Sequence, residues 1–512
     1  MKTKQKPLST QSEWTFELIQ SYEHEISKIA KDFGLSTFPN QIEIISAEQM
    51  MDAYSSVGMP VGYHHWSYGK QFLQTFQSYK RGRMGLAYEI VINSNPCISY
   101  LMEENSITMQ ALVIAHACYG HNSFFKNNYL FQTWTSPSAI IDYLVFAKNY
   151  VARCEELHGV QAVEQIIDSC HALQNFGVDR YKRPQPISAQ QEEDRQRERE
   201  EQRQQQINLL WKTIPLSEQT KSKAKPVRFP GEPEENILYF VEKNAPLLEP
   251  WQREIIRIVR KIAQYFYPQR QTQVMNEGWA TFWHYTIINE LYDRGLVTDS
   301  FMMEFIESHS AVIRQPDFDD PYYSGINPYA LGFAIYRDLR RICEEPTEED
   351  KMWFPEYADS DWLATLDFAM KNFKDESFIL QFLSPRVMRD FKFFAIKDHE
   401  SDPFYVVDSI HNESGYHQIR KILSEQYNLS INEPNIQVIN VNLHGNRELT
   451  LRHIQTDERP LAKDTELTLK HLYRLWGFPV RLESKSKTTI TRILQVPPET
   501  TSIEAYDIPF SG

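Results

Sequence analysis

The chain is poor in cysteine and has no long apolar run. No 18 consecutive residues are apolar, so we expect no membrane-spanning helix. The opening stretch MKTKQKPLSTQSEW has basic residues but no apolar run behind them, so we expect no secretory signal peptide. The five cysteines, at 97, 118, 154, 170 and 343, are scattered without paired metal-ligand spacing. Such a sparse, odd set indicates reduced thiols and predicts a cytoplasmic protein.

The chain also lacks an excess of positive charge and the common phosphate-binding motifs. Its formal net charge is −14, which argues against a nonspecific nucleic-acid binder, because such a protein needs a basic face. G-x-x-x-x-G-K-[ST], G-x-G-x-x-G and G-x-S-x-G are all missing, so neither a nucleotide loop nor a serine hydrolase is indicated. Aromatic residues are plentiful, with 27 Tyr, 29 Phe and 10 Trp, and they suit a large core and concave sites.

The apolar patterning predicts an α+β protein in four parts. The predicted parts are a helical region with a histidine motif (1–183), a charged linker or insertion (184–236), a second helical region packing on the first (237–397) and a small α+β domain (398–512). In the first part, a strand YEIVIN precedes a helix that begins after the cap residue Ser106 and runs into two histidines. That strand–helix layout predicts a zincin-like core.

Two further segments have a distinctive composition. Residues 188–206, SAQQEEDRQREREEQRQQQ, form a charge run without an apolar face. This composition predicts a solvated helix or a disordered insert, with a partner-binding tail as the alternative. After residue 398 the pattern alternates strand, helix, strand, strand, helix and strand, which predicts a small domain with an antiparallel sheet.

The stretch VIAHACYGHNSFF holds His116 and His121, five residues apart. In a regular α-helix such a pair points about 140° apart, whereas the helical zinc motif spaces its histidines four apart and places a glutamate beside the first. Here Ala117 stands at that place. Gly120 could end or bulge the helix and bring His121 back, so a metal site and a pair of packed histidines both remain open.

The stretch MNEGWATFWHY carries Glu277 and His284, two helical turns apart and about 10 Å along the axis. Since zinc ligands lie about 2.0–2.2 Å from the ion, the two are not expected to share one ion. One could bind a metal while the other lines the same groove or supports the ligands. A carboxylate among these aromatic residues must be paired, protonated or metal-bound, and a purely structural carboxylate is the alternative.

A third group of candidates lies on two consecutive predicted helices. Asp168 and His171 are three apart and therefore neighbours on a helix face, a spacing that suits a metal or a hydrogen-bonded pair. Glu155 and Glu156 lie on the preceding helix. Ordinary helix polarity is the alternative interpretation for all four.

Several long motifs resemble one known family. They are HACYGHNSFFKNNYLF, CEELHG, CHALQNFGVDRYKRP, MNEGWATFWH, NPYALGFAIYRDLRRI and DESFILQFLSPRVMRDFKFF. With these motifs the chain resembles the SpoVR family, stage V sporulation protein R, over nearly its whole length, and most of all members from non-sporulating Gram-negative bacteria. The resemblance implies a large helical region with a small C-terminal domain and a cytoplasmic role in spore cortex formation or stationary-phase stress physiology. It also implies a link with a serine protein kinase of the PrkA type and its von Willebrand-like companion.

The pairing of HACYGH with NEGWATFW is also similar to metallopeptidases that combine a histidine helix with an E-G-W-A helix. This similarity implies His116, His121 and Glu277 as ligands of zinc or another divalent transition metal. The general base of that family is replaced by Ala117, so Glu155, Glu156 or Asp168 would have to activate water.

Two functional hypotheses follow. In the first, the protein is a metal-dependent amide hydrolase acting on peptides or peptidoglycan precursors, in which His284 or His171 orients the substrate or stabilises the oxyanion. In the second, the protein is a non-catalytic regulator that uses an old enzyme scaffold to bind the kinase or its companion.

Overall fold

The computed structural model describes residues 6–55, 62–68, 70, 72–74, 89–180, 229–230, 232–318, 320–397, 406–409, 411–443, 445–455, 460–486 and 489–497. The charge run 188–206 lies outside these residues. The chain divides into two compact units, each built from two segments. Unit 1 comprises 1–167 and 262–433, and unit 2 comprises 168–261 and 434–512. The four-part division expected from the sequence stays a prediction.

Unit 1 is mainly helical. Its elements, in chain order, are α1 (Phe16–Asp32), β1 (Asn40–Ile45), α2 (Ala47–Ser55), β2 (Glu89–Ile92), β3 (Cys97–Met102), α4 (Ile107–Val113), η1 (Ile114–His121), α5 (Asn122–Asn127), α6 (Tyr129–Trp134), α7 (Ile140–His158), α12 (Gln273–Asp293), α13 (Asp299–Val312), α14 (Pro328–Glu344), α15 (Glu348–Trp353), α16 (Trp362–Asn372), α17 (Asp375–Phe382), α18 (Pro385–Asp390), β4 (Ala395–Lys397), β5 (Val406–Ser409), α19 (Glu413–Gln426) and α20 (Leu429–Asn432). Two helices, α8 (Val160–Ala172) and α11 (Pro250–Gln271), contain the points where the chain passes between the units.

Helix boundaries in unit 1 follow from local chemistry. Thr15 caps α1 by accepting from the Leu18 amide, and Gly34 takes the left-handed conformation (φ 78°) just after its end, as glycine does at little cost. Ser106 caps α4 by accepting from the Met109 amide, which confirms the helix start predicted at this serine. Local sequence therefore sets where these helices begin and end.

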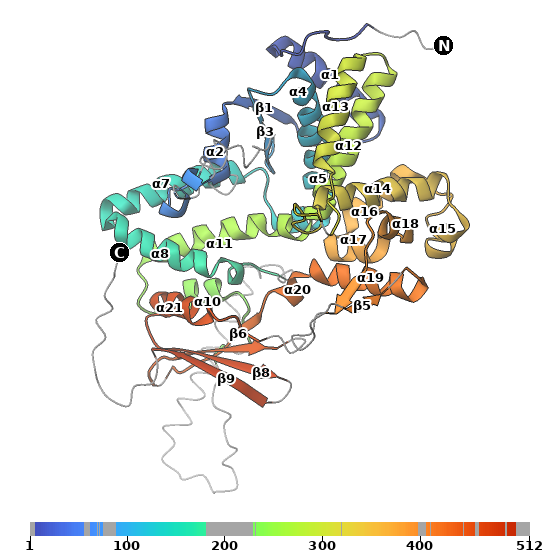
Figure 1. The fold of residues 1–512 in the computed structure, drawn as a ribbon. Coiled ribbons are helices and arrows are strands. Elements are labelled where there is room, and N and C mark those ends of the chain that lie inside the picture. Colours follow the sequence, from blue (N-terminus) through green and yellow to red (C-terminus); the bar gives the residue numbers. More distant parts are fainter. Residues whose placement is uncertain are drawn as a thin grey trace, which may run out of the picture. The chain divides into compact units, whose positions relative to one another are not determined.

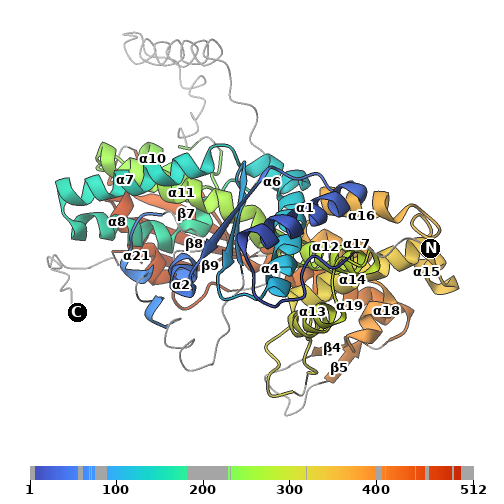
Figure 2. The same cartoon turned by 90° about the horizontal axis from the view of Figure 1, so that it is seen from above.

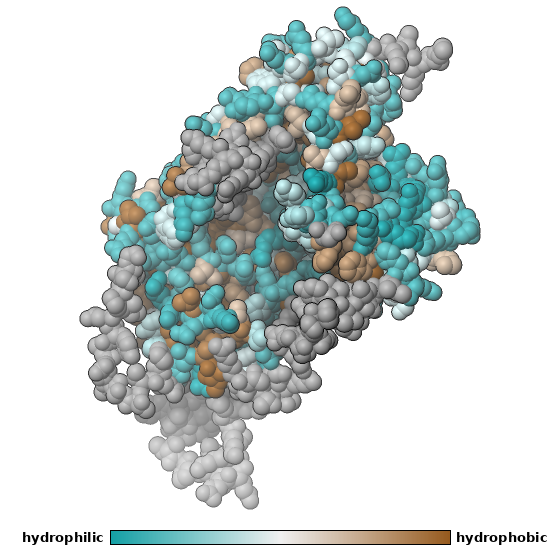
Figure 3. Space-filling view, in the orientation of Figure 1, coloured by the Kyte–Doolittle hydropathy of each residue, from teal (hydrophilic) through white to brown (hydrophobic). Residues whose placement is uncertain are grey.

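The core of unit 1 is one large apolar cluster that α1, α4, η1, α12, α14 and α16–α19 share. The views in Figures 1 and 2 agree in placing α4, α12 and α13 side by side. Trp279, Trp283 and Tyr336 are among its largest fully buried side chains. Consistent with this burial, most of the face shown in Figure 3 is hydrophilic, with small hydrophobic patches among the coloured residues.

A three-stranded sheet of order β1-β3-β2 packs beside the helix that holds the histidines. Strand β3 pairs parallel with β1 and antiparallel with β2, so β2 is an edge strand. It forms at the predicted YEIVIN segment, and Ile90 and Ile92 are buried on one of its faces. Because successive side chains of a strand point to opposite faces, Glu89 and Val91 share the other face.

Unit 2 holds a four-stranded sheet and a few helices. Its elements are η2 (Gln174–Phe176), α10 (Ile237–Asn244), β6 (Asn435–Val441), β7 (Leu449–Ile454), α21 (Thr465–Trp476), β8 (Val480–Ser486) and β9 (Thr489–Val496). The sheet order is β6-β7-β8-β9. The strands predicted within this range are all present, and β9 is an additional one.

The expected antiparallel sheet is wrong in two respects. Strands β7 and β8 are parallel, because α21 forms the crossover that a parallel pair requires. The first strand predicted after residue 398 corresponds to β5, which pairs with β4 in a separate two-stranded sheet of unit 1. The protein is therefore an α+β protein with a mixed sheet in unit 2. No helix among the described residues has the length and apolar character needed to cross a membrane.

Candidate metal centre

The two histidines of the opening motif lie on a π-helix. Helix α4 continues without a break into η1, an eight-residue π-helix, and then into α5. A π-helix closes its hydrogen bonds between residues five apart, so His116 and His121 lie one above the other. Their ring centroids are 4.6 Å apart. The divergence of an α-helical pair therefore does not occur, and the π-helix matches the alternative in which a bulge at this motif brings His121 back beside His116.

A close helix crossing brings this π-helix against α12. A Cβ atom on Gly120 would lie 2.5 Å from the Ala280 Cα and 2.8 Å from its Cβ, distances that no packed structure tolerates. The Trp279 indole also donates to the Ser123 hydroxyl at 2.9 Å. The absent side chain of Gly120 therefore allows the contact that places Glu277 beside the histidines.

Glu277 bridges the two histidines. Its Oε2 atom lies 3.5 Å from His121 Nε2 and 3.8 Å from His116 Nε2. This oxygen is buried and has no hydrogen-bond partner, although the side chain as a whole is 20% exposed. The structure thus brings together the three residues that the sequence predicted as ligands.

A second carboxylate comes from the sheet. Glu89, the first residue of β2, lies on the strand face opposite Ile90 and Ile92. Its Oε1 atom is 3.3 Å from His116 Nε2, and its ligand oxygen lies within 4.8 Å of a nitrogen of each histidine. Sequence reasoning missed Glu89. The sequence does contain a signal, namely an acid at the start of an otherwise apolar strand that precedes the histidine helix by one further strand.

The spacing of these donors fits a bound metal. Four ligand atoms about 2.0–2.1 Å from a tetrahedral zinc ion lie about 3.3–3.4 Å from one another, and the nitrogen–oxygen distances in this cluster are 3.3, 3.5 and 3.8 Å. Among the residues that the structure describes, no lysine or arginine forms an ion pair with Glu89 or Glu277. Two close carboxylates without a cation have a charge that a dication would neutralise.

The surroundings shift the pKa values of the two carboxylates in opposite directions. Burial raises the pKa of Glu89, and the charge of Glu277 adds to this effect against the opposing charge of His116. Burial also acts on Glu277 and would raise its pKa, but the charges of His121 and His116 outweigh burial and lower the pKa. The two groups therefore differ in their tendency to hold a proton.

The histidines are oriented by contacts behind them. His121 Nδ1 lies 2.9 Å from the side-chain oxygen of Asn276, so the nitrogen donates and its Nε2 is left with the lone pair. His116 Nδ1 lies 2.9 Å from His284 Nδ1, and His284 Nε2 lies 2.8 Å from His309 Nδ1. Such outer contacts are typical of metal-binding histidines. His309 and Asn276 were not predicted from the sequence.

The remaining candidates lie on α7 and α8. Glu155 and Glu156 lie in the last turns of α7, and burial raises the pKa of Glu155 against the opposing charge of His64. Asp168 and His171 lie on α8, in the part of it that belongs to unit 2. The catalytic roles suggested for these four residues stay predictions.

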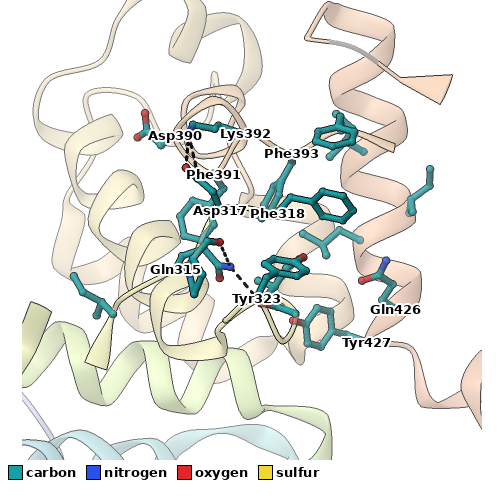
Figure 4. A pocket seen from close by; sticks show the side chains of 18 residues that line it. Gln315, Asp317, Phe318, Tyr323, Asp390, Phe391, Lys392, Phe393, Gln426 and Tyr427 are labelled. Atoms are coloured by element: carbon teal, nitrogen blue, oxygen red, sulfur yellow. Dashed lines mark hydrogen bonds and ion pairs between the residues drawn. The ribbon is translucent and has the colours of Figure 1, made fainter. Parts of the chain in front are cut away.

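Unit 1 also contains a cavity of about 840 Å³ beyond the end of α13. Aromatic side chains line it, among them Phe318, Tyr323 and Phe393 (Figure 4). Lys392 and Asp317 form an ion pair there, with both oxygen distances 3.0 Å. This cavity contains none of the residues of the histidine cluster.

Comparisons with known proteins agree with the sequence motifs. A family model described as SpoVR like protein matches residues 13–432, and one described as SpoVR-like C-terminal domain matches residues 434–487. The chain is 62% identical to the Uncharacterized protein YcgB of Escherichia coli (strain K12) over 488 aligned residues. The aligned region covers 95% of this chain and 96% of that protein. No solved structure matches. Two family models and a close relative thus cover nearly the whole length, and the chain belongs to the SpoVR family.

Proposed function

We propose that this chain binds one divalent transition metal, with zinc the best match, through His116, His121 and Glu277. The observation that carries the proposal is Glu277 Oε2, a buried oxygen without a hydrogen bond that faces both Nε2 atoms at 3.5 and 3.8 Å. Leaving such an oxygen without a partner costs free energy, and a cation between the three donors removes that cost. Imidazole and carboxylate donors are the set that zinc accepts.

We further propose that the centre is a zincin-like hydrolase site for an amide bond in a peptide or a peptidoglycan precursor. A bound metal ion would acidify a water molecule and polarise the scissile carbonyl. Glu89 would accept the proton as the water oxygen bonds to the carbonyl carbon, and would deliver it to the nitrogen as the C–N bond breaks. The raised pKa of Glu89 supports this role, which Ala117 cannot perform.

A second candidate, a non-catalytic regulator, is favoured by the Glu89 oxygen that lies within 4.8 Å of a nitrogen of each histidine. If Glu89 is a fourth ligand, all four positions around a tetrahedral ion are filled by protein, as in structural zinc sites. The protein would then use the centre to hold η1, α12 and β2 together. Its partner would be the PrkA-type serine protein kinase or the von Willebrand-like companion that the family resemblance suggests.

The cellular setting belongs to the same proposal. All five cysteines are buried and free of disulfides, which supports a reducing compartment such as the cytoplasm. The family resemblance supports a role in sporulation-like or stationary-phase stress physiology.

The test is metal content and affinity in a matched pair of variants. Protein purified without a histidine tag should contain about one transition metal per chain, as expected of a single set of three or four ligands. Glu277→Gln should lose the metal, whereas Glu89→Gln should keep it and lose hydrolysis of amide substrates. Equal loss of metal in both variants would favour the regulator. A wild-type chain without metal and without measurable affinity for zinc would overturn the proposal.

A further inference from the structure

Three histidines form a continuous hydrogen-bonded chain behind the centre. His116 comes from η1, His284 from α12 and His309 from α13. The nitrogen–nitrogen distances are 2.9 Å between His116 Nδ1 and His284 Nδ1, and 2.8 Å between His284 Nε2 and His309 Nδ1. All three rings are buried. Since each ring is held by a different helix, this row of hydrogen-bonded histidines results from tertiary packing and not from local sequence.

The direction of hydrogen bonding along this chain is linked to the metal site. A neutral imidazole carries one N–H and one lone pair. If His116 offers the Nε2 lone pair to a metal, its proton is on Nδ1 and donates to His284. The His284 proton is then on Nε2 and donates to His309 Nδ1. The reverse direction puts a proton on His116 Nε2, where it faces Glu89 and Glu277 and blocks the metal.

We propose that His284 and His309 are positioning residues that lock His116 in the metal-binding tautomer. The inference rests on the proposed metal centre. His309 touches none of the proposed ligands, yet its Nδ1 lone pair is the acceptor that keeps the His284 proton on Nε2. Without that acceptor, His284 gains a hydrogen bond by moving its proton to Nδ1 and donating to His116.

The surroundings of His309 favour this arrangement. Its ring packs against Phe305, Tyr285 and Phe333, with centroid distances of 5.6, 5.0 and 5.0 Å. These aromatic rings limit the access of water that could replace His284 as a partner. Burial and the nearby Arg337 charge lower the pKa of His309 to about 4, so this ring is neutral near pH 7 and keeps a lone pair that can accept the His284 proton.

The position of His284 also differs from the role suggested by sequence. Both of its ring nitrogens face histidine nitrogens at hydrogen-bonding distance. This arrangement leaves neither nitrogen to a substrate or an oxyanion. The contacts of His284 are those of a residue that acts through His116.

The experiment compares three single variants of the full chain. His309→Phe removes the acceptor but suits the aromatic surroundings, and His309→Asn restores an oxygen acceptor near the Nδ1 position. Tyr285→Phe alters the same surroundings without touching the acceptor. Zinc affinity is measured by chelator competition, and the visible spectrum of the cobalt-loaded protein reports the ligand field. Melting of the metal-free proteins reports the fold.

We expect His309→Phe to weaken zinc binding by about 10-fold or more, as loss of an outer partner does, and to shift the cobalt bands. His309→Asn and Tyr285→Phe should stay within about threefold of the wild type, well below that effect. If His309→Phe melts early, His309→Leu serves as the variant that lacks an acceptor. Wild-type affinity in the Phe and Leu variants would overturn the positioning role but leave the metal centre intact. Absence of zinc binding in the wild type would overturn both.

Discussion

Glu242 in unit 2 and Glu277 in unit 1 are both carboxylates on helices, but their neighbours differ. The Glu242 side chain is 1% exposed and lies 3.0 Å from Lys243 Nζ, 3.0 Å from Arg257 Nε and 3.2 Å from Arg260 Nε. Burial disfavours its charge, yet these cations outweigh burial and lower its pKa. One lysine and two arginines therefore compensate the charge of Glu242 within the protein itself.

The Glu277 cluster has no such cation among the described residues. Its nearest basic partners are the imidazoles of His121 and His116, and a second acid, Glu89, lies 3.3 Å from His116 Nε2. Histidines can be neutral at physiological pH, so this cluster can be short of positive charge where the Glu242 cluster is not. A buried acid with arginine and lysine partners therefore indicates a structural role, whereas buried acids gathered around imidazole nitrogens indicate a site for a cation.

The largest expected effect comes from removing the carboxylate of the proposed centre. Glu277→Gln should lower zinc affinity by at least about 100-fold, because loss of a direct ligand exceeds the loss of an outer partner. The metal-free protein should melt near the wild-type temperature, since the uncompensated acid is gone. Chelator competition and thermal melting measure the two quantities. A variant that keeps full affinity would remove the distinction between the two clusters.

A larger side chain between η1 and α12 should weaken metal binding although no proposed ligand is changed. Gly120→Ala places a Cβ 2.5 Å from the Ala280 Cα, so we expect a destabilisation of about 2–3 kcal/mol from overpacking together with weaker metal binding. Urea denaturation and zinc titration provide the test. Gly62→Ala, at a glycine with nothing within 4 Å of the added atom, is the matched control and should leave both values nearly unchanged.

Glu242→Gln should lower stability without lowering zinc affinity, the reverse of what we expect for Glu277→Gln. It leaves three cations without their shared acid, and because Lys243 and Arg257 are partly exposed we expect a loss of about 2 kcal/mol. Zinc affinity should not change. If this variant lost metal while keeping its stability, the assignment of a structural role to the Glu242 cluster would be wrong.

The smallest effect concerns a third buried acid, Asp375, which accepts from the backbone amides of Val274 and Met275 at 2.9 and 2.8 Å. Burial raises its pKa to about 7 despite these hydrogen bonds. A carboxyl with a raised folded-state pKa contributes full stability below about pH 4 and loses it as the pH rises through about 7. Between pH 5 and pH 8, the stability advantage of wild type over Asp375→Asn should fall by about 1–2 kcal/mol.

That measurement is made by urea denaturation with a chelator present, so that the metal centre does not contribute. The chelator therefore ensures that the pH dependence reports Asp375, an acid bound by backbone amides, and not the acids beside the imidazoles. A difference between wild type and variant that is independent of pH would show that Asp375 is already ionised at pH 5.

Local patterns were sufficient for much of the fold and part of the site. The strand at YEIVIN, the helix beginning after Ser106 and the strands and helices after residue 412 form as predicted, because caps, turns and periodicity act between near neighbours in the chain. His116, His121 and Glu277 were named as ligands from their motifs, and they lie together. The parallel pairing of β7 with β8 was missed, since strand order depends on contacts distant in sequence.

What local patterns left open depended on how helices cross. Spacing alone placed His116 and His121 on diverging faces, and the π-helix reversed that conclusion. The close contact of Gly120 with Ala280 sets which residues of α12 meet the histidines. Glu89 and His309 joined the cluster from a strand and a helix whose own sequences carry no metal motif. Long-range packing determines such meetings, because side chains far apart in the chain come together only when the core that carries them is complete.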